Sequence, residues 1–476
     1  MYRTRLCLSF LLLLAQVAIA FAHADTPASE YVARRAALVK RMGPDDILLL
    51  LSPPPSNRDG DVDWPFRQED NLLYLTGIQE PETTLILVPG QSDLPELLLA
   101  RPSKPQEEVW TGRVPTADAL TAKSGVKVVV TDMDLNTVIE SVLDTRDMQA
   151  KMSAGKVTVW VSMEKRNLGK TPSPELAFVE QLRRSYPDLQ FHDAFPLIAD
   201  MRKIKSPTEM TSLQRAIDVT VAAQKAGMLR AKTAQYEYQV QATIDFTFRD
   251  LGACCWAFPS IVAAGRNGTT LHYESDNDPI VKGGLLITDI GAEVDGYSAD
   301  VTRTYPQNGT FTAEQRDIYE AVLRVQTATM AMMKPGTTME TLQKKATAML
   351  GDELLKLGLI SENTTEQVRL YFYHGLGHPI GLRTHDDGVG FKHPFMAGMV
   401  VTNEPGLYVR PDDVRASKTY QALPEAARAR IDAALKKYAD IAVRIEDDVL
   451  ITQGEPKNLS AGAPRSIAEI EAWMRQ

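Results

Sequence analysis

Short apolar runs alternate with helix-compatible stretches between residues 25 and 200. The runs are rich in leucine and β-branched residues and are separated by Pro, Gly and Asp, as is typical of strands and turns. Strands interleaved with helices indicate an α/β domain. The runs predict strands at residues 47–51, 83–88, 95–100, 126–130 and 157–161.

The pattern changes near residue 200, where a long helix is expected to begin. Residues 206–209 form a capping box with a proline at the first helical position, and apolar residues then recur at helical spacing. A second capping box at residues 312–315 opens another helix, and a further helix should reach about Gly358. Because strands lie between these helices, we predict an α+β domain over residues 201–476 and a smaller α/β domain over residues 25–200.

Residues 1–24 differ from both domains. Arg3 and Arg5 precede an apolar run that ends at Ala22-His23-Ala24, a pattern typical of a signal-peptide cleavage site. A membrane anchor is the alternative, but roughly 20 apolar residues are needed to span a bilayer and this run is shorter. We therefore expect an exported protein, periplasmic or secreted, with no membrane anchor after cleavage.

The 476 residues include 52 Lys+Arg and 61 Asp+Glu, a formal net charge of −9. This acidic balance does not provide the basic surface that nucleic-acid binding requires, so no nucleic-acid partner is expected. Of the three cysteines, Cys7 leaves with the signal peptide and Cys254 adjoins Cys255. Neighbouring Cα atoms are about 3.8 Å apart, below the ~4.4 Å minimum of ordinary disulfide geometry. We expect no bridge between them and interpret them as two small buried residues rather than a redox pair.

One acidic residue lies in the middle of an apolar strand predicted at residues 285–291. This residue is Asp289, and burying a carboxylate without a partner costs several kcal/mol. Asp295-Gly296 predicts a two-residue hairpin loop that pairs residue 289 with residue 302. Asp300 would then lie diagonally opposite Asp289 on the same face, within roughly 7 to 8 Å. Two such carboxylates can hold a divalent metal, and two ordinary solvent-facing aspartates are the alternative.

Two further acidic residues follow the same pattern. Glu404 ends the β-branched run 399–403, and Glu446 lies inside a strand predicted at residues 441–448. Arg444 would share a strand face with Glu446, so an ion pair between them is an alternative explanation for this acid.

Histidines cluster in the same part of the chain. Five lie between His272 and His393, two of them in the segment His374-Gly375-Leu376-Gly377-His378. Imidazole is a common metal ligand and a near-neutral acid or base, so the cluster marks a candidate site.

Together these residues resemble the dinuclear metal set of the pita-bread metallopeptidases, the family that contains aminopeptidase P, prolidase and methionine aminopeptidase. The strings TDIGAEVDGYSADVTRTYP, HGLGHPIGL, TNEPGLY and VRIEDDVLIT are most similar to the proline-specific branch. FRQEDNLLYLTGIQEPE and EEVWTGR resemble the aminopeptidase P N-terminal domain. The resemblance covers nearly all of the chain after residue 24. It implies an α+β pita-bread catalytic domain preceded by a smaller α/β domain of the creatinase/aminopeptidase P type.

By this resemblance, Asp289 and Asp300 bind one divalent metal, His378 and Glu404 bind the other, and Asp300 and Glu446 bridge the two. An oxygen-rich donor set with one imidazole suits Mn²⁺, and Zn²⁺ or Co²⁺ could also bind. Two divalent cations also balance the four carboxylates. The nucleophile implied for the family is a hydroxide held between the metals, with Glu404 passing the proton to the leaving proline nitrogen.

Further residues are assigned by the same resemblance. His272 and His385 line the substrate site and donate hydrogen bonds to the oxyanion, and Arg444 orients a ligand or a contact behind it. His374 lies beside the pocket or has a structural role. Trp110 reaches toward a neighbouring subunit or is an ordinary core or surface tryptophan, so a homo-oligomer, a dimer or tetramer, is expected.

The sequence thus predicts an Xaa-Pro aminopeptidase that acts on proline-containing peptides. Prolidase, an Xaa-Pro dipeptidase, is the alternative. Aminopeptidase P members often carry a bulkier aromatic pair at the positions of Pro379 and Ile380, and the HGLGH form is seen in prolidase-like members. A metal-free C–N hydrolase or a non-catalytic binding module would predict loss of the five ligand residues, and all five are present.

Overall fold

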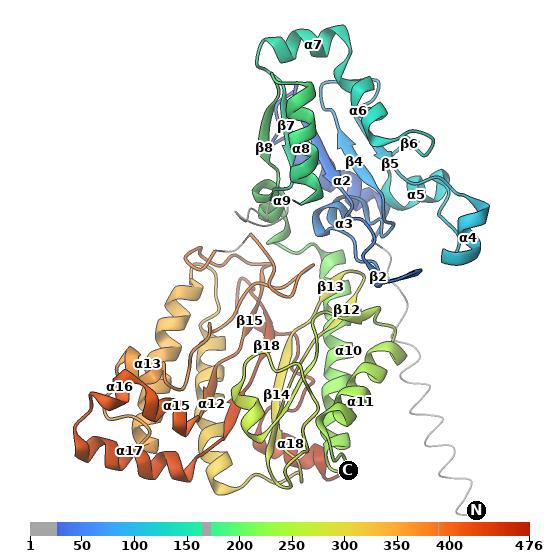
Figure 1. The fold of residues 1–476 in the computed structure, drawn as a ribbon. Coiled ribbons are helices and arrows are strands. Elements are labelled where there is room, and N and C mark those ends of the chain that lie inside the picture. Colours follow the sequence, from blue (N-terminus) through green and yellow to red (C-terminus); the bar gives the residue numbers. More distant parts are fainter. Residues whose placement is uncertain (1–25, 164–172, 389) are drawn as a thin grey trace, which may run out of the picture. The chain divides into compact units, whose positions relative to one another are not determined.

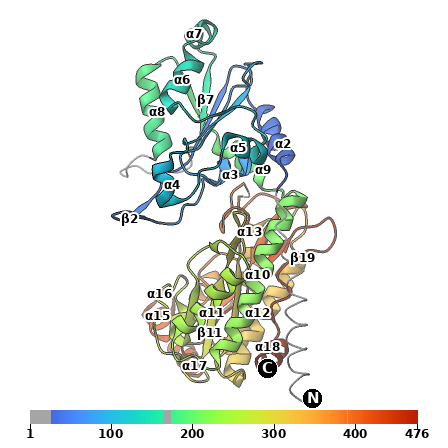
Figure 2. The same ribbon diagram turned by 90° about the vertical axis from the view of Figure 1, so that its right-hand side faces the viewer.

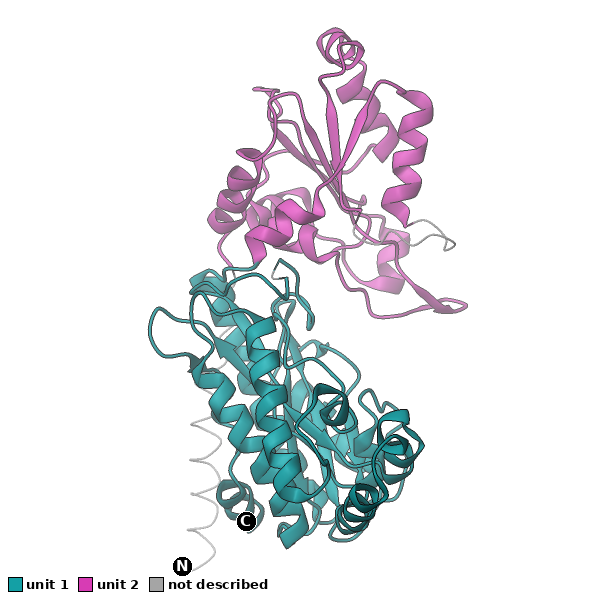
Figure 3. Cartoon of the chain, turned by 90° about the vertical axis from the view of Figure 1, so that its left-hand side faces the viewer, with its two compact units in different colours: residues 1–24, 203–476 teal, residues 25–202 magenta. Residues whose placement is uncertain are grey.

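The structure is a computed structural model that describes residues 26–163, 173–388 and 390–476. The expected signal peptide, residues 1–24, lies outside the described residues. The chain divides into two compact units (Figure 3), an N-terminal unit of residues 25–202 and a C-terminal unit of residues 203–476. None of the helices in the described ranges has the length and apolar character that a bilayer-spanning segment needs.

A six-stranded sheet in the order β6-β5-β4-β1-β7-β8 forms the N-terminal unit (Figure 1). β4 is antiparallel to β1 and to β5, whereas β7 is parallel to β1 and to β8. The five strands expected from the sequence are all present. The strands of this unit, with the short hairpin β2–β3, are β1 (Ile47–Leu51), β2 (Asn57–Asp59), β3 (Val62–Asp63), β4 (Thr84–Leu87), β5 (Glu96–Leu99), β6 (Val129–Val130), β7 (Thr158–Val161) and β8 (Gln190–Asp193).

Helices cover both faces of this sheet, which explains why β1 is apolar throughout. Successive side chains of a strand point to opposite faces. Ile47 and Leu49 join a core cluster with residues of α6, α7 and α8, and α3 also packs on β1. Figure 2 shows α6 and α8 on one side of the sheet and α2 on the other. The helices are α2 (Ala28–Val39), α3 (Asp70–Thr76), α4 (Pro105–Thr111), α5 (Ala117–Ser124), α6 (Leu135–Leu143), α7 (Arg146–Ser153), α8 (Pro174–Ser185) and α9 (Phe195–Arg202).

Short sheets form the centre of the C-terminal unit. Their strand orders are β10-β11-β14, β13-β12-β9, β15-β18-β19 and β16-β17. Contacts of β14 with β17 and β18, and of β11 with β17, bring the sheets together. The strands are β9 (Cys255–Trp256), β10 (Ile261–Ala264), β11 (Leu285–Ile290), β12 (Ala292–Val294), β13 (Tyr297–Ser298), β14 (Val301–Pro306), β15 (Val400–Asn403), β16 (Gly406–Tyr408), β17 (Ala442–Arg444), β18 (Asp447–Leu450) and β19 (Lys457–Asn458).

Long helices flank these strands, with α10 and α11 on one side and α12 and α13 on the other (Figure 1). α10 begins at the capping box of Ser206 and Glu209, and α12 at that of Thr312 and Gln315, as the sequence predicted. α10 packs on β12, β13 and β14, and α12 packs on β15, β16 and β17. The helical segments are α10 (Pro207–Ala231), α11 (Glu237–Asp250), η1 (Gly265–Thr269), α12 (Ala313–Ala331), α13 (Met339–Leu357), α14 (Thr365–Val368), α15 (Pro411–Ala416), α16 (Lys418–Gln421), α17 (Glu425–Lys437) and α18 (Ile467–Met474).

Candidate metal centre

The hairpin of β11 and β14 positions the first two acidic residues. Asp289 in β11 is paired with Thr302 in β14, which is the register expected from the sequence. The turn residues Asp295 and Gly296 have φ values of 54° and 84°, as a type I′ loop requires. Asp300 directly precedes β14, so its carboxylate lies close to that of Asp289.

His378 and Glu404 come from two segments that are joined by backbone hydrogen bonds. The amide of Thr402 in β15 donates to the His378 carbonyl at 2.8 Å, and the amide of Glu404 donates to the Leu376 carbonyl at 2.8 Å. His378 Nε2 lies 3.5 Å from Asp300 Oδ2 and 3.6 Å from Glu404 Oε1. The imidazole therefore lies between carboxylates that are far apart in the sequence.

Glu446 reaches the cluster from a break between two strands. The expected continuous strand over residues 441–448 is wrong, because β17 ends at Arg444 and β18 begins at Asp447. The Glu446 amide donates to the Thr302 carbonyl at 3.1 Å, and Thr302 Oγ1 donates to Glu446 Oε2 at 2.6 Å. These contacts with β14 hold Glu446 in the break and direct its side chain to the hairpin.

The carboxylates and the imidazole converge at one buried point. One donor atom each of Asp300, His378 and Glu446 lies within 4.8 Å of the other two. Asp300 is 4% exposed and Glu446 is 1% exposed. Among the five acidic and histidine residues predicted as ligands, three buried carboxylate oxygens have no hydrogen-bond partner in the described part of the chain, namely Asp289 Oδ1, Asp300 Oδ1 and Glu446 Oε1.

Three carboxyl groups of the cluster also have raised pKa values. Burial, and then the charge of Asp289, raises the pKa of Asp300 well above its usual range. Burial and the charge of Asp300 raise the pKa of Glu446 in the same way, and burial raises the pKa of Glu404 to about 7. Ionised carboxylates packed together without water or cations are unfavourable. Three unpartnered oxygens and one imidazole at this point fit the ligand preferences of divalent metal ions.

Arg444 links Asp289 to a tyrosine and a histidine. Its Nη2 donates to Asp289 Oδ2 at 2.7 Å and its Nη1 donates to the Tyr408 hydroxyl at 2.8 Å. That hydroxyl lies 2.8 Å from His374 Nε2, whose other ring nitrogen lies 2.7 Å from the Gly375 carbonyl. Among the described residues, the carboxylate that pairs with Arg444 is thus Asp289, and the ion pair with Glu446 considered from the sequence is corrected.

Three further histidines lie around the cluster. The ring centroids of His385 and His378 are 4.2 Å apart. Burial, followed by the charges of His378 and His272, lowers the pKa of His385 to about 4. Burial also lowers the pKa of His374 to about 3, with smaller contributions that include Arg444 and His272. His272 is exposed, and its charge is among the causes that lower both pKa values.

Three residues of the site were not singled out from the sequence: Thr302, Tyr408 and Asp448. The Asp300 amide donates to Asp448 Oδ2 at 3.2 Å, and burial raises the pKa of Asp448 to about 8. A signal for Asp448 existed, because residues 446–448 are three consecutive acids within an apolar stretch. Thr302 and Tyr408 gave no such signal, since uncharged residues are common in buried strands.

Comparison with known proteins covers both units. Residues 211–453 match metallopeptidase family M24, and residues 31–150 match the aminopeptidase P N-terminal domain. Over 458 residues the chain is 31% identical to the Xaa-Pro aminopeptidase of Escherichia coli (strain K12), covering 94% of this chain and 97% of that protein. It is 32% identical to Xaa-Pro aminopeptidase 3 of Homo sapiens over 460 residues, covering 93% and 85%. The structure of E. coli aminopeptidase P with the inhibitor Pro-Leu matches with a TM-score of 0.81 at 30% identity, covering 95% of this chain and 99% of that one.

Proposed function

Since the chain belongs to metallopeptidase family M24 and carries an aminopeptidase P N-terminal domain, we propose that it is an Xaa-Pro aminopeptidase. It would hydrolyse the peptide bond between an N-terminal residue and a following proline. The family and the fold predicted from the sequence, a pita-bread catalytic domain after a smaller α/β domain, are confirmed by these matches. The observation that carries the function is the buried cluster of unpartnered carboxylate oxygens beside one imidazole.

The cluster would hold two divalent cations, most suitably Mn²⁺, with Zn²⁺ and Co²⁺ as alternatives. Asp289 and Asp300 would hold one ion, His378 and Glu404 the other, and Asp300 and Glu446 both. When bound, such ions act as Lewis acids and lower the pKa of water, which makes it a nucleophile near neutral pH. Their charge also offsets the repulsion among the four carboxylates.

Glu404 is the residue proposed to move the proton. A carboxylate at this position would accept a proton from the attacking water and release it to the proline nitrogen. His385 and His272 are proposed to donate hydrogen bonds to the oxygen of the attacked carbonyl. Because the pKa of His385 is about 4, its ring is neutral at pH 7 and keeps one N–H for this contact.

Arg444 and His374 are proposed to position other residues of the site without contacting the reacting atoms. Arg444 occupies one oxygen of Asp289 and so orients the other. Both ring nitrogens of His374 are engaged, by Tyr408 and by Gly375, which supports a structural role for His374 over direct substrate binding.

A peptide-length assay tests the proposal against its alternatives. Metal-reconstituted protein is given Xaa-Pro dipeptides, Xaa-Pro-Yaa tripeptides and matched Xaa-Ala-Yaa tripeptides, and metal content is measured in parallel. Cleavage of the proline tripeptides, with the alanine peptides left intact, supports the aminopeptidase. Cleavage of dipeptides alone would instead make the chain a prolidase. A metal-loaded protein that cleaves none of these peptides would be a binding module.

We also propose export and self-association. The apolar segment 1–24 supports export to the periplasm or the exterior, and N-terminal sequencing of protein from the native host tests cleavage after Ala24.

Trp110 on α4 is 82% exposed, which supports a homo-oligomer, dimer or tetramer, in which this tryptophan meets another copy. Light scattering of the parent and of Trp110→Ala tests this assembly.

A further inference from the structure

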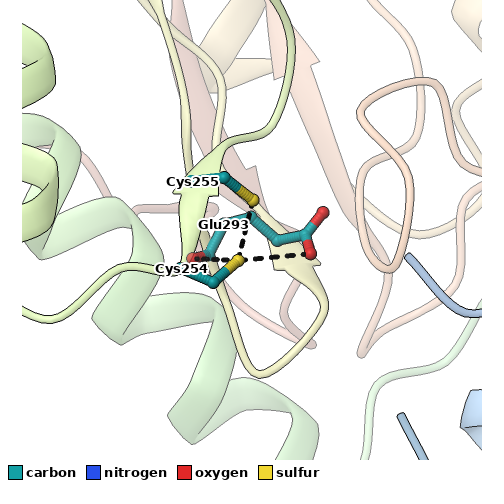
Figure 4. A group of neighbouring side chains, drawn as sticks. All are labelled: Cys254, Cys255 and Glu293. Atoms are coloured by element: carbon teal, nitrogen blue, oxygen red, sulfur yellow. Dashed lines mark hydrogen bonds between the residues drawn. The ribbon is translucent and has the colours of Figure 1, made fainter. Parts of the chain in front are cut away.

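Cys254 and Cys255 lie beside Glu293 in the C-terminal unit (Figure 4). The expectation that both cysteines are buried is wrong, because Cys254 is exposed and Cys255 is half-buried. Cys254 lies in the turn that leads into β9, which is an edge strand of the sheet β13-β12-β9. Both cysteines are free thiols in the structure, and the absence of a bridge between them stays a prediction.

Backbone pairing holds the three side chains together. Cys255 in β9 is paired with Glu293 in β12, and the Cys254 amide donates to the Glu293 carbonyl at 3.1 Å. Arg249 at the end of α11 donates to the carbonyls of Ala253 and Cys254, which fixes the turn that leads into β9. The positions of the two cysteines therefore follow from the fold and do not depend on contacts between the sulfur atoms.

The spacing of the donor atoms suits a small tetrahedral metal ion. The two Sγ atoms are 2.8 Å apart, Cys254 Sγ lies 3.5 Å from Glu293 Oε1, and the three donor atoms all lie within 4.8 Å of one another. A tetrahedral zinc ion, with Zn–S of about 2.3 Å, separates two sulfurs by about 3.8 Å and a sulfur from an oxygen by about 3.5 Å. The sulfur–oxygen distance already matches. The sulfurs need to separate by about 1 Å, which small side-chain rotations provide.

We propose that Cys254, Cys255 and Glu293 form a second metal site, which binds a thiophilic divalent cation such as Zn²⁺. Thiolate ligands select zinc over manganese, whereas the carboxylate-rich centre contains no sulfur, so the two sites take different metals. Glu293 is 5% exposed, so its carboxylate would be the third ligand, on the buried side of the ion. The exposed side of Cys254 leaves the fourth coordination position to solvent. Since β12 continues the chain from β11, the ion would tie β9 to the hairpin that carries Asp289.

A redox pair is the competing interpretation of two adjacent thiols. A disulfide here would have to form across Cα atoms only about 3.8 Å apart, below the ordinary range. A disulfide needs no third donor atom, whereas the Glu293 carboxylate, 3.5 Å from Cys254 Sγ, completes a metal site.

Cobalt(II) binding provides the test, because only cobalt bound to sulfur gives a thiolate-to-metal charge-transfer band in the near ultraviolet. The experiment uses reduced full-length protein carrying Asp300→Ala, which removes a ligand from the other centre. We expect Co²⁺ to produce this band together with the visible absorption of tetrahedral cobalt. Cys254→Ser and Cys255→Ser should each abolish the band, and Glu293→Gln should weaken Co²⁺ binding about tenfold or more. Glu425→Gln, an exposed carboxylate on α17, is the matched control and should change nothing.

Three outcomes would overturn the proposal: a spectrum without the sulfur band, a band that survives either serine substitution, or a Co²⁺ affinity that Glu293→Gln leaves unchanged. Circular dichroism of each variant shows that the fold is intact, which the close sizes of serine and cysteine favour. Because the readout is optical, the result does not depend on peptidase activity.

Discussion

Arg444 and Asp289 form an ion pair inside the C-terminal unit, with Arg444 Nη2 2.7 Å from Asp289 Oδ2. Arg444 ends β17 and Asp289 lies in β11, so the pair joins strands that are 155 residues apart in the sequence. Asp289 Oδ1, in contrast, has no hydrogen-bond partner in the described part of the chain. The guanidinium thereby determines which oxygen of Asp289 is left for a cation.

Replacing Arg444 by methionine should destabilise the metal-free protein by about 3 to 5 kcal/mol, because it leaves the Asp289 carboxylate buried without its cation. Arg415→Met is the matched control, since Arg415 pairs with Asp432 at 2.8 Å on the surface, where each side chain is more than 40% exposed. That change should cost less than about 1 kcal/mol. Urea unfolding of both variants measures the difference, and equal losses would contradict this role of Arg444.

The two glycines near His378 should differ in their tolerance of a methyl group. A Cβ at Gly377 would lie 2.1 Å from the Thr402 carbonyl oxygen, whereas one at Gly375 would meet no atom within 4 Å. Gly377→Ala should therefore disturb the pairing of Thr402 with His378 and weaken Mn²⁺ binding about tenfold or more. Gly375→Ala should leave the affinity nearly unchanged. Calorimetric titration with Mn²⁺ compares them, and similar affinities would refute the steric argument.

The hairpin could be predicted from the sequence because its turn is local. Asp295-Gly296 favours a two-residue loop, and this loop alone sets the pairing of Asp289 with Thr302. The partner of Arg444 could not be predicted in this way. A shared strand face made Glu446 the nearer candidate, and only the packing of β17 against β11 brings Asp289 within reach.

The break that holds Glu446 and the exposure of Cys254 also depend on tertiary structure. Residues 441–450 are apolar enough to form one strand, and the break arises where the Glu446 amide bonds to the Thr302 carbonyl instead of continuing a ladder. The small apolar side chain of cysteine suggests burial, but Cys254 is exposed in the turn before the edge strand β9. Neither feature has a local signal, because each is set by a distant strand.

The pH dependence of the metal-free protein should reveal the raised pKa of Glu404. Burial raises this pKa from 4.5 to about 7. A raised carboxyl pKa stabilises the fold fully below the unfolded value, and this contribution is lost as the pH rises through the folded value. Glu404→Gln lacks the ionising group, so its melting temperature relative to the parent should rise between about pH 4.5 and pH 7.

Thermal denaturation in a chelator, with both proteins measured at each pH, tests this prediction. The paired comparison cancels the opposite contributions of His374 and His385, whose pKa values are lowered by burial. A difference between variant and parent that stays constant over this range would show that Glu404 is not protonated in the metal-free fold.

Metal binding should reverse the effect of removing a carboxylate from the cluster. In the metal-free protein, Asp300→Ala or Glu446→Ala removes one buried acid that has an unpartnered oxygen, so either variant should unfold at about the same temperature as the parent or higher.

Mn²⁺ at 100 times its dissociation constant should stabilise the parent by about 2.7 kcal/mol and should not stabilise these variants. Asp317→Asn, at a surface acid 3.0 Å from Lys437, should respond to Mn²⁺ as the parent does. Both alanine variants should also lose turnover of Xaa-Pro-Yaa peptides, because without the metals the pKa of the attacking water is not lowered. Turnover retained by either one would refute the mechanism, since these residues would then not hold the metals on which it depends.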